Sequence, residues 1–471
     1  MKKHTQGRAS HQVRRTRRQL TENKDSCLEK LLPRQQLQEA IDRHGMEFRD
    51  CLYTPLVTLW TFLYQVLSAD QSCRAAVARL LAWLSLPGSD DADTQDASAK
   101  TDPYCKARAR LPEALIADLA RDSGKQLHEQ VPPTGLLAGR AIKIADGTTV
   151  SMPDTPENQK AYPQSTAQKP GLGFPILRLV ALISLSAGSV LDVAMGPYAG
   201  KNTGETALLR QLLAGLKAGD VLLADAYFAN YWMILLLLNR GVDVVMKHDG
   251  KRPVDFRGGK RLGRQDHVTS WSKPARPPWM SRRLYRSLPQ TLSLREVKLP
   301  VQQKGFRVRW LLLVTTLLDA GKYSKEELAS AYRLRWHAEL DLRSIKQAMQ
   351  MDILRCKSPS MVRKELWMHL LAYNLVRKLM AESAAVAKIS PRSISFKGTL
   401  QTLTAFAAAG WGCPVPAEAK LYDTIMKAVA THRVGNRPDR VEPRAVKRRP
   451  KEQTYLTEPR AIAKARLMGR S

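Results

Sequence analysis

The chain has 471 residues, of which 44% are hydrophobic and 25% are charged, a composition that excludes wholesale disorder and indicates globular domains. Lys and Arg number 75 against 43 Asp and Glu, so the formal net charge at pH 7 is +32. A balance this basic predicts a polyanionic partner, and a nucleic-acid backbone is the usual one.

The first 135 residues are predicted to form a helical N-terminal domain. Residues 1–20 hold a cluster of basic side chains that suits a flexible arm or the entry to a helix. Between residues 27 and 85, apolar side chains recur at helical spacing, among them Leu56, Leu59, Trp60, Leu63 and Leu67. A polar, acidic loop at 87–103 precedes a second helical portion that ends near residue 130. The positive charge favours a DNA-binding role for this domain over a purely structural one.

From about residue 138, strand-like and helix-like segments alternate. Residues 140–145 predict a strand that ends at Asp146, and 221–224 predict another that ends at Asp225. The other expected elements are a hairpin of 177–185 with 190–195, helices at 205–216 and 230–239, and a strand at 242–247. This order predicts an α/β design, a mixed sheet flanked by helices, with its first part in residues 136–250. Ligands of such sheets bind at strand ends, where both aspartates lie.

Residues 251–320 interrupt this pattern and are predicted to form a β-rich insertion. Two strand-like runs, 292–301 and 306–316, are joined across Gln303-Lys304-Gly305. Three tryptophans in this part of the chain suit either stacking on DNA bases or core packing, and the leucines that follow Trp310 favour packing there; they are Trp271, Trp279 and Trp310.

Helices resume at Ser324, which is expected to be an N-cap because Glu327 follows it by three residues. Residues 321–385 are assigned to the C-terminal helices of the core. The basic C-terminal region, 386–471, includes Lys447-Arg448-Arg449 and is expected to serve DNA contact or assembly.

Cysteine usage and hydropathy indicate the cellular compartment in which the protein is expected. The six cysteines include no C-x-x-C pair, so neither a zinc knuckle nor a disulfide framework is indicated. The basic N-terminus lacks a following apolar stretch, and the apolar run 232–238 is too short to span a bilayer. We therefore expect a soluble cytoplasmic protein with no membrane partner.

Three carboxylates are the candidate catalytic residues: Asp146, Asp225 and Glu339. Two aspartates at strand ends and a glutamate on a later helix can converge on a pair of divalent cations. Oxygen-only ligation is what Mg²⁺ or Mn²⁺ prefers, and two such ions can hold the attacking and leaving oxygens of a phosphodiester. In so basic a chain, this arrangement indicates metal-dependent cutting or joining of nucleic acid.

The helix that carries Glu339 is expected to present one functional face. At about 100° per residue, Tyr332, Arg335, Glu339 and Lys346 fall within an arc of roughly 60°, and Arg343 lies close by. Cations around a carboxylate favour its ionised form, and the same cations can bind phosphates. A solvated helix face with i,i+4 ion pairs is the alternative. Asp341 is expected on the other side of the helix.

The spacing of these residues resembles the signature of a known protein family. Tyr332, Arg335, Glu339 and Lys346 reproduce the Tyr-(2)-Arg-(3)-Glu-(6)-Lys signature of the insertion-sequence-four family of bacterial DDE transposases. The block 144–155 resembles the first aspartate motif of that family, and Leu223-Ala224-Asp225-Ala226-Tyr227-Phe228 resembles the second. The resemblance spans about residues 105–385, and the long gap between Asp225 and Glu339 suits a β-rich insertion.

The resemblance implies an RNase H-like catalytic core with two divalent metal ions, Mg²⁺ or Mn²⁺, bound by Asp146, Asp225 and Glu339. Water would cut double-stranded DNA at the terminal inverted repeats of the element, and the freed 3′-OH would attack target DNA. Tyr332, Arg335, Arg343 and Lys346 would contact the DNA. Because an element has two ends, a homodimer on DNA is expected, associated with the bacterial nucleoid.

Two other functions remain compatible with the residues. A nuclease or resolvase would keep the fold and cut without joining. A DNA-binding protein descended from a transposase would have lost its chemistry, although all three carboxylates are present. The cut-and-paste transposase is the leading hypothesis.

Overall fold

The computed structural model describes residues 27–46, 51–85, 98–301, 310–409, 415–435 and 455–468. Four sequence predictions lie outside these residues: the basic arm at 1–20, most of the acidic loop at 87–97, the turn at 303–305 and the basic stretch at 447–449. The chain divides into two compact units. Unit 1 comprises residues 1–131, 187–191 and 342–434, and unit 2 comprises 132–186, 192–341 and 435–471.

In its described residues, unit 1 is built mainly from helices. They are α2 (Cys27–Leu31), α3 (Arg34–Arg43), α4 (Pro55–Leu67), α5 (Cys73–Leu84), α6 (Asp102–Arg110), α7 (Glu113–Gln130), the π-helical η2 (Ser344–Ala348), α15 (Pro359–Val386), the 3₁₀ turn η3 (Pro391–Ser393), α16 (Phe396–Ala409) and α17 (Val415–Thr431). The apolar residues predicted at helical spacing between 56 and 67 are buried on α4. Thr54 caps this helix, because its side chain accepts the N–H of Val57.

Helix α15 forms the core of unit 1, and α4, α7, α16 and α17 pack against it. Most of its side chains are buried, including the polar Asn374. The Asn374 amide donates to the carbonyl oxygens of Ala120 and Val190 and accepts the N–H of Val190, each at 2.9 Å. A buried amide with all these bonds made fixes α7 and the 187–191 segment on α15.

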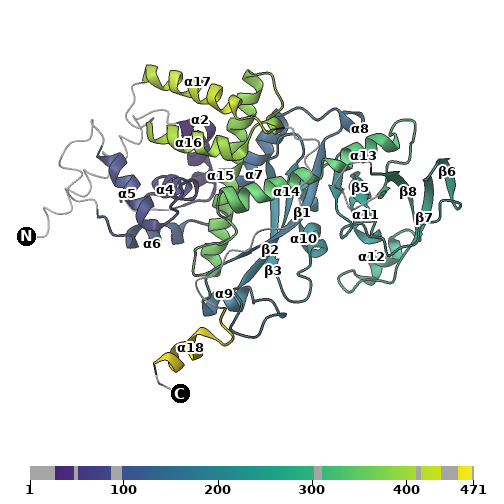
Figure 1. Ribbon diagram of the computed structural model, residues 1–471, viewed down its shortest axis with the longest axis horizontal. Coiled ribbons are helices and arrows are strands. Elements are labelled where there is room, and N and C mark those ends of the chain that lie inside the picture. Colours follow the sequence, from purple (N-terminus) through teal and green to yellow (C-terminus); the bar gives the residue numbers. More distant parts are fainter. Residues whose placement is uncertain are drawn as a thin grey trace, which may run out of the picture. The chain divides into compact units, whose positions relative to one another are not determined.

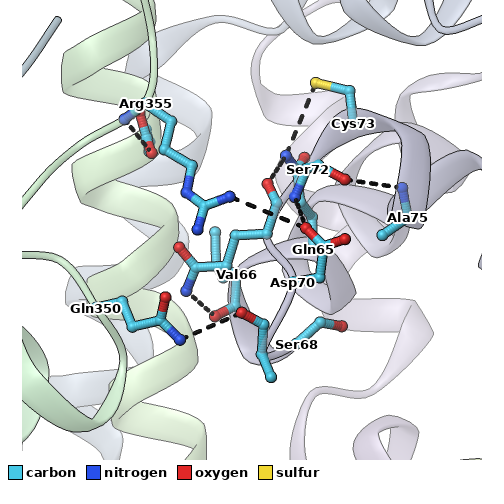
Figure 2. A network of polar contacts seen from close by, with 12 residues as sticks. Gln65, Val66, Ser68, Asp70, Ser72, Cys73, Ala75, Gln350 and Arg355 are labelled. Carbon is cyan, nitrogen blue, oxygen red and sulfur yellow. Dashed lines mark hydrogen bonds and ion pairs between the residues drawn. The ribbon is translucent and has the colours of Figure 1, made fainter.

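The connection between α4 and α5 is held by polar contacts, which Figure 2 shows. Asp70 accepts the N–H of Ser72 at 2.9 Å, and Arg355 approaches the same carboxylate at 4.0 Å. Gln350 donates to the carbonyl oxygen of Ala69 at 3.2 Å. The segment that follows η2 is thereby fastened to the N-terminal helices within unit 1.

Unit 2 contains one mixed sheet (Figure 1). Its strands are β1 (Ile142–Ser151), β2 (Ile176–Ser184), β3 (Val190–Pro197), β4 (Val221–Ala224), β5 (Asp243–Lys247), β6 (Lys260–Gly263), β7 (Asp266–Ser272), β8 (Thr291–Pro300) and β9 (Trp310–Thr315). Its helices are α8 (Leu136–Gly139), α9 (Pro156–Ala161), α10 (Glu205–Gln211), the 3₁₀ turn η1 (Leu213–Gly215), α11 (Tyr231–Leu238), α12 (Arg282–Ser287), α13 (Lys325–Arg333), the start of α14 (Trp336–Arg343) and α18 (Arg460–Leu467). The α/β prediction for this part of the chain is confirmed.

The strand order is β3-β2-β1-β4-β5-β9-β8-β7-β6. Strands β1, β4 and β5 are parallel neighbours, and the pairs on either side are antiparallel. All four residues of β4 are buried, as expected for a central strand with both faces covered. The insertion strands β6 to β9 continue the sheet beyond β5, because β9 pairs with β5 through Val245↔Thr315.

Two polar clusters stabilise the inserted strands. Arg295 is fully buried and makes paired bonds of 2.8 and 2.6 Å to the carboxylate of Asp266. The carboxylate of Glu296 accepts the indole N–H of Trp271 at 2.8 Å and lies 3.0 Å from Nε2 of His267. Trp271 is therefore a core residue. Trp310 differs from its prediction: it is 47% exposed at the start of β9, and Lys298 lies over its ring.

Candidate active site

The two aspartates lie at one edge of the parallel pair β1 and β4. This pairing ends at Ile144↔Leu223, two residues before Asp146 and Asp225 respectively. The expectation that β1 ends at Asp146 is wrong, because its antiparallel pairing with β2 continues through Asp146↔Ala181 to Ser151. The carboxyl edge of the β1–β4 pair nevertheless carries both side chains.

Each aspartate uses one oxygen to order the backbone that follows it. Oδ1 of Asp146 accepts the N–H of Gly147 at 3.0 Å, and Oδ1 of Asp225 accepts the N–H of Tyr227 at 2.9 Å. The second bond closes a turn of the kind that Asp favours after a strand. Both residues are partly buried, and these two bonds to backbone N–H groups orient their carboxylates.

Glu339 lies on α14, and the residues before it do not form the single continuous helix that was expected. Helix α13 ends at Arg333 and α14 begins at Trp336. Across the break, Arg335 N–H bonds to the Tyr332 carbonyl oxygen at 2.9 Å, which is the tighter i to i−3 pattern. The break places Arg335 in the turn between the two helices. Ser324 caps α13 as predicted, while the Glu327 carboxylate accepts the N–H of Leu137 in α8.

Arg335 connects two of the candidate catalytic carboxylates. Its Nη2 lies 2.7 Å from Oε1 of Glu339, and its Nη1 lies 3.4 Å from Oδ2 of Asp146. Arg335 and Asp146 are each 15% exposed, and Glu339 is 37% exposed. The ring of Tyr332, which is buried, lies 5.9 Å from the guanidinium carbon. Residues far apart in the sequence thus meet around one cation.

The electrostatics of this cluster leave negative charge only partly compensated. Burial raises the pKa of Asp146 to about 6, the carboxylates of Glu339 and Asp225 add to the rise, and Arg335 opposes it. Burial also raises the pKa of Tyr332 to about 12, so its hydroxyl remains protonated at neutral pH. Further positive charge would therefore stabilise the ionised form of Asp146.

The donor set suits a hard divalent cation, because it consists of carboxylate oxygens. In the described part of the chain, however, no three His, Cys, Asp or Glu side chains are arranged to hold a metal ion as they stand. Two of the candidate carboxylates already share a cation, because the Arg335 guanidinium bonds to both Asp146 and Glu339.

Arg343 and Lys346 belong to unit 1, whereas Tyr332, Arg335 and Glu339 belong to unit 2. Arg343 donates to Gln347 at 2.9 Å, and Lys346 lies in the π-helical η2. The spacing of about 100° per residue does not hold through a π-helix. The single helical face expected for Tyr332 to Lys346 is therefore not formed as predicted.

Other acidic residues near these elements have different environments. Asp220 is buried and forms a structural ion pair with Lys143 at 2.6 Å. Asp341 is fully buried. Glu205, which was not singled out from the sequence, packs its carboxylate against Gly147, beside Asp146. A glutamate in the first turn of a helix is ordinary, so its sequence position carried no signal for this placement.

Comparison with known proteins assigns the chain to a family. The family model described as "Transposase DDE domain" matches residues 138–375. The chain belongs to the DDE transposases, which confirms the resemblance found in the sequence. Members of this family act on DNA and use divalent metal ions.

Relatives from Escherichia coli agree with this assignment. The transposase InsG for insertion sequence element IS4, from strain K12, is 28% identical over 364 residues, which cover 75% of this chain and 78% of that protein. The transposase for insertion sequence element IS421 is 30% identical over 124 residues, covering 24% of this chain and 33% of that protein. The chain is thus a DDE transposase similar to that of IS4.

A chain from the piggyBac transposase synaptic complex with hairpin DNA aligns with a TM-score of 0.41 and 11% identity, over 88% of this chain and 86% of that one. At this score the likeness adds nothing to the family assignment. Among the described helices, none has the length and apolar character needed to cross a membrane.

Proposed function

We propose that the chain is the transposase of an insertion sequence, and that it cuts DNA at the element ends and joins the freed 3′-OH to target DNA. The observation that carries this proposal is the meeting of Asp146, Arg335 and Glu339 at the edge of the sheet beside Asp225. Carboxylates in this position, within a DDE transposase, support phosphodiester chemistry on DNA. The site would act in the bacterial cytoplasm, on nucleoid DNA.

Asp146, Asp225 and Glu339 are proposed to hold two divalent ions, Mg²⁺ or Mn²⁺, in an RNase H-like core. When bound, such ions supply Lewis-acid stabilisation of the phosphate and a nucleophile at neutral pH. The three carboxylates provide the oxygen ligands. Burial of Asp146 keeps bulk water from screening the negative charge that attracts a cation.

Arg335 is proposed to change partners during the reaction. In the structure its guanidinium bonds to both Asp146 and Glu339. On DNA it would instead bind a phosphate near the cut, where its planar donors can make two parallel bonds. Tyr332 would position it, because the buried ring lies beside the guanidinium. Arg343 and Lys346 are proposed to contact further phosphates of the element end.

Metal-dependent nicking of element-end DNA tests the catalytic assignment. Asp146→Asn, Asp225→Asn and Glu339→Gln should each abolish nicking in Mg²⁺ while DNA binding persists. Glu326→Gln is the matched control, since Glu326 is an exposed acid on the neighbouring helix α13. Normal nicking by any of the first three variants would remove that residue from the proposed metal site.

Salt dependence of DNA binding tests the proposed phosphate contacts. Each lost contact should reduce the slope of log K against log[salt] by about 0.9. Arg335→Ala and Lys346→Ala should both show this reduction, together with slower nicking. Lys260→Ala, an exposed lysine on the outermost strand β6, serves as the control. Slopes for Arg335→Ala and Lys346→Ala that match the wild type would exclude both residues from phosphate binding.

The working assembly is proposed to be a homodimer on two element ends. A DNA element has two ends, and one active site per chain requires a second chain for the other end. The net charge of +32 opposes association of the free protein, and DNA would neutralise it. The helical region 1–135 and the basic region 386–471 are proposed to recognise the ends and pair the chains. Light scattering with and without element-end DNA tests this proposal. A complex that contains a single chain and still joins both ends would refute it.

A further inference from the structure

A fourth carboxylate lies beside the proposed catalytic residues. Glu205 is the first residue of α10, and its carboxylate packs on the backbone of Gly147, which directly follows Asp146. A Cβ atom at position 147 would lie 2.5 Å from Cδ and 2.5 Å from Oε1 of Glu205. Such a contact is far closer than two non-bonded heavy atoms tolerate. A side chain at position 147 would displace the Glu205 carboxylate.

Gly147 is required here for space rather than for its backbone conformation. It is not among the glycines with positive φ in the described chain, so its φ is one that other residues adopt. Its neighbours in β1 also pair regularly with β2, through Gly147↔Val180. The absence of a side chain at this position therefore serves the close approach of Glu205.

The segment before α10 is fixed so that Glu205 reaches this position. Arg178 on β2 donates to the carbonyl oxygen of Thr203 at 3.0 Å, and its guanidinium lies 4.5 Å from the centre of the Tyr198 ring. These contacts anchor both ends of the loop 198–203. The α10 helix also packs on β2, which sets the direction of its first residue.

The Glu205 carboxylate is half-buried, and within the described residues it has no hydrogen-bond or ion-pair partner. Burial raises its pKa, the neighbouring charge of Asp225 adds to the rise, and the charge of Arg178 opposes it. Burying a carboxylate without a partner costs free energy, which a bound cation would recover. Glu205 thus lies against the residue that follows Asp146, and its negative charge interacts with that of Asp225.

We propose that Glu205 is a fourth acidic residue of the divalent-cation site and a ligand of the ion held by Asp146 and Asp225, either directly or through one bound water. This inference rests on the metal site of the proposed function. Gly147 is the positioning residue for Glu205: it acts only by leaving room for the carboxylate.

Binding of Mn²⁺ to the metal-free, full-length protein without DNA tests this inference. Mn²⁺ affinity is measured by titration, with free Mn²⁺ followed by electron paramagnetic resonance. Glu205→Gln should weaken Mn²⁺ binding by about tenfold or more, the range found when residues supporting a metal site are removed. Gly147→Ala should weaken it similarly although it leaves every carboxylate in place. Glu157→Gln, an exposed glutamate in the first turn of α9, should bind Mn²⁺ as the wild type does.

Two outcomes overturn the inference and differ from each other. If Asp146→Asn loses Mn²⁺ affinity while Glu205→Gln keeps it, the metal site stands and Glu205 is not part of it. If Asp146→Asn also keeps wild-type affinity, the proposed metal site itself fails, and the role of Glu205 fails with it. Glu205→Gln preserves the size of the side chain, so it remains informative even if Gly147→Ala disturbs β1.

Discussion

Neutralising Asp146 should stabilise the metal-free protein while abolishing catalysis. The pKa of Asp146 is raised from 3.8 to about 6 in the folded protein. Between these values the folded state binds more protons than the unfolded state, so stability falls as the pH rises from about 4 to about 6. Above about pH 6 the ionised carboxylate lowers the free energy of unfolding by a constant amount. Asparagine carries no charge, so the substitution removes this destabilisation.

The magnitude follows from the size of the pKa shift. A shift of about two units corresponds to about 3 kcal/mol between low and neutral pH, and the side chain is too buried for much solvent screening. This shift already includes the favourable interaction with Arg335, which opposes the rise in the pKa. For a unit of this size, the difference in Tm between Asp146→Asn and wild type should grow by about 5 to 10 °C from pH 4 to pH 7.

The assay is thermal unfolding in a chelator at several pH values, with the wild type and Asp146→Asn measured side by side. Subtracting the wild-type curve of Tm against pH from that of the variant removes the contribution of groups that titrate identically in both proteins. Adding Mn²⁺ should then raise the Tm of the wild type and leave the variant unchanged, because only the wild type binds the ion. A difference in Tm that stays constant from pH 4 to pH 7 would refute the raised pKa and the reasoning built on it.

Two predictions concern stability away from the proposed catalytic residues. Gly124→Ala should lower the Tm despite a helix-propensity gain of about 1 kcal/mol, because the added Cβ would lie 2.0 Å from the carbonyl oxygen of Val190; a higher Tm would contradict this. Asp266→Ala leaves the fully buried Arg295 without its carboxylate and should cost about 3–5 kcal/mol in denaturant unfolding. Asp255→Ala, at an exposed ion pair, is the control and should change stability little.

The sequence predicted the parts of the fold that depend on local pattern. Apolar runs that end at Asp146 and Asp225 predicted two strands, which the structure shows to be parallel neighbours, and Ser324 predicted the start of α13. The extent of β1 was missed, because its outer half is polar and its pairing with β2 is a long-range contact. Periodicity reports which residues face a core, and it does not report where pairing stops.

The arrangement of the candidate site was predictable only in part. The family signature identified Tyr332, Arg335 and Glu339, yet the angular argument assumed one regular helix. The break before Trp336 and the π-helical η2 depend on packing that sequence spacing does not record. Glu205 was missed for a related reason: its position depends on a loop held by Arg178 and on the missing side chain at position 147.

The pairing of β9 with β5 fixes the inner edge of the insertion on the core of the sheet, whereas β6 to β8 lie beyond it. The chain leaves the core at Lys247 and returns on β9, whose residue Leu313 pairs with that same Lys247. A slip of one residue in this register would reverse which side chains face the core and move the start of α13 by about 3.3 Å. Strands β6 to β8 lie farther out, so length changes there leave this register intact. A length change among β6 to β8 should therefore leave the start of α13 in place.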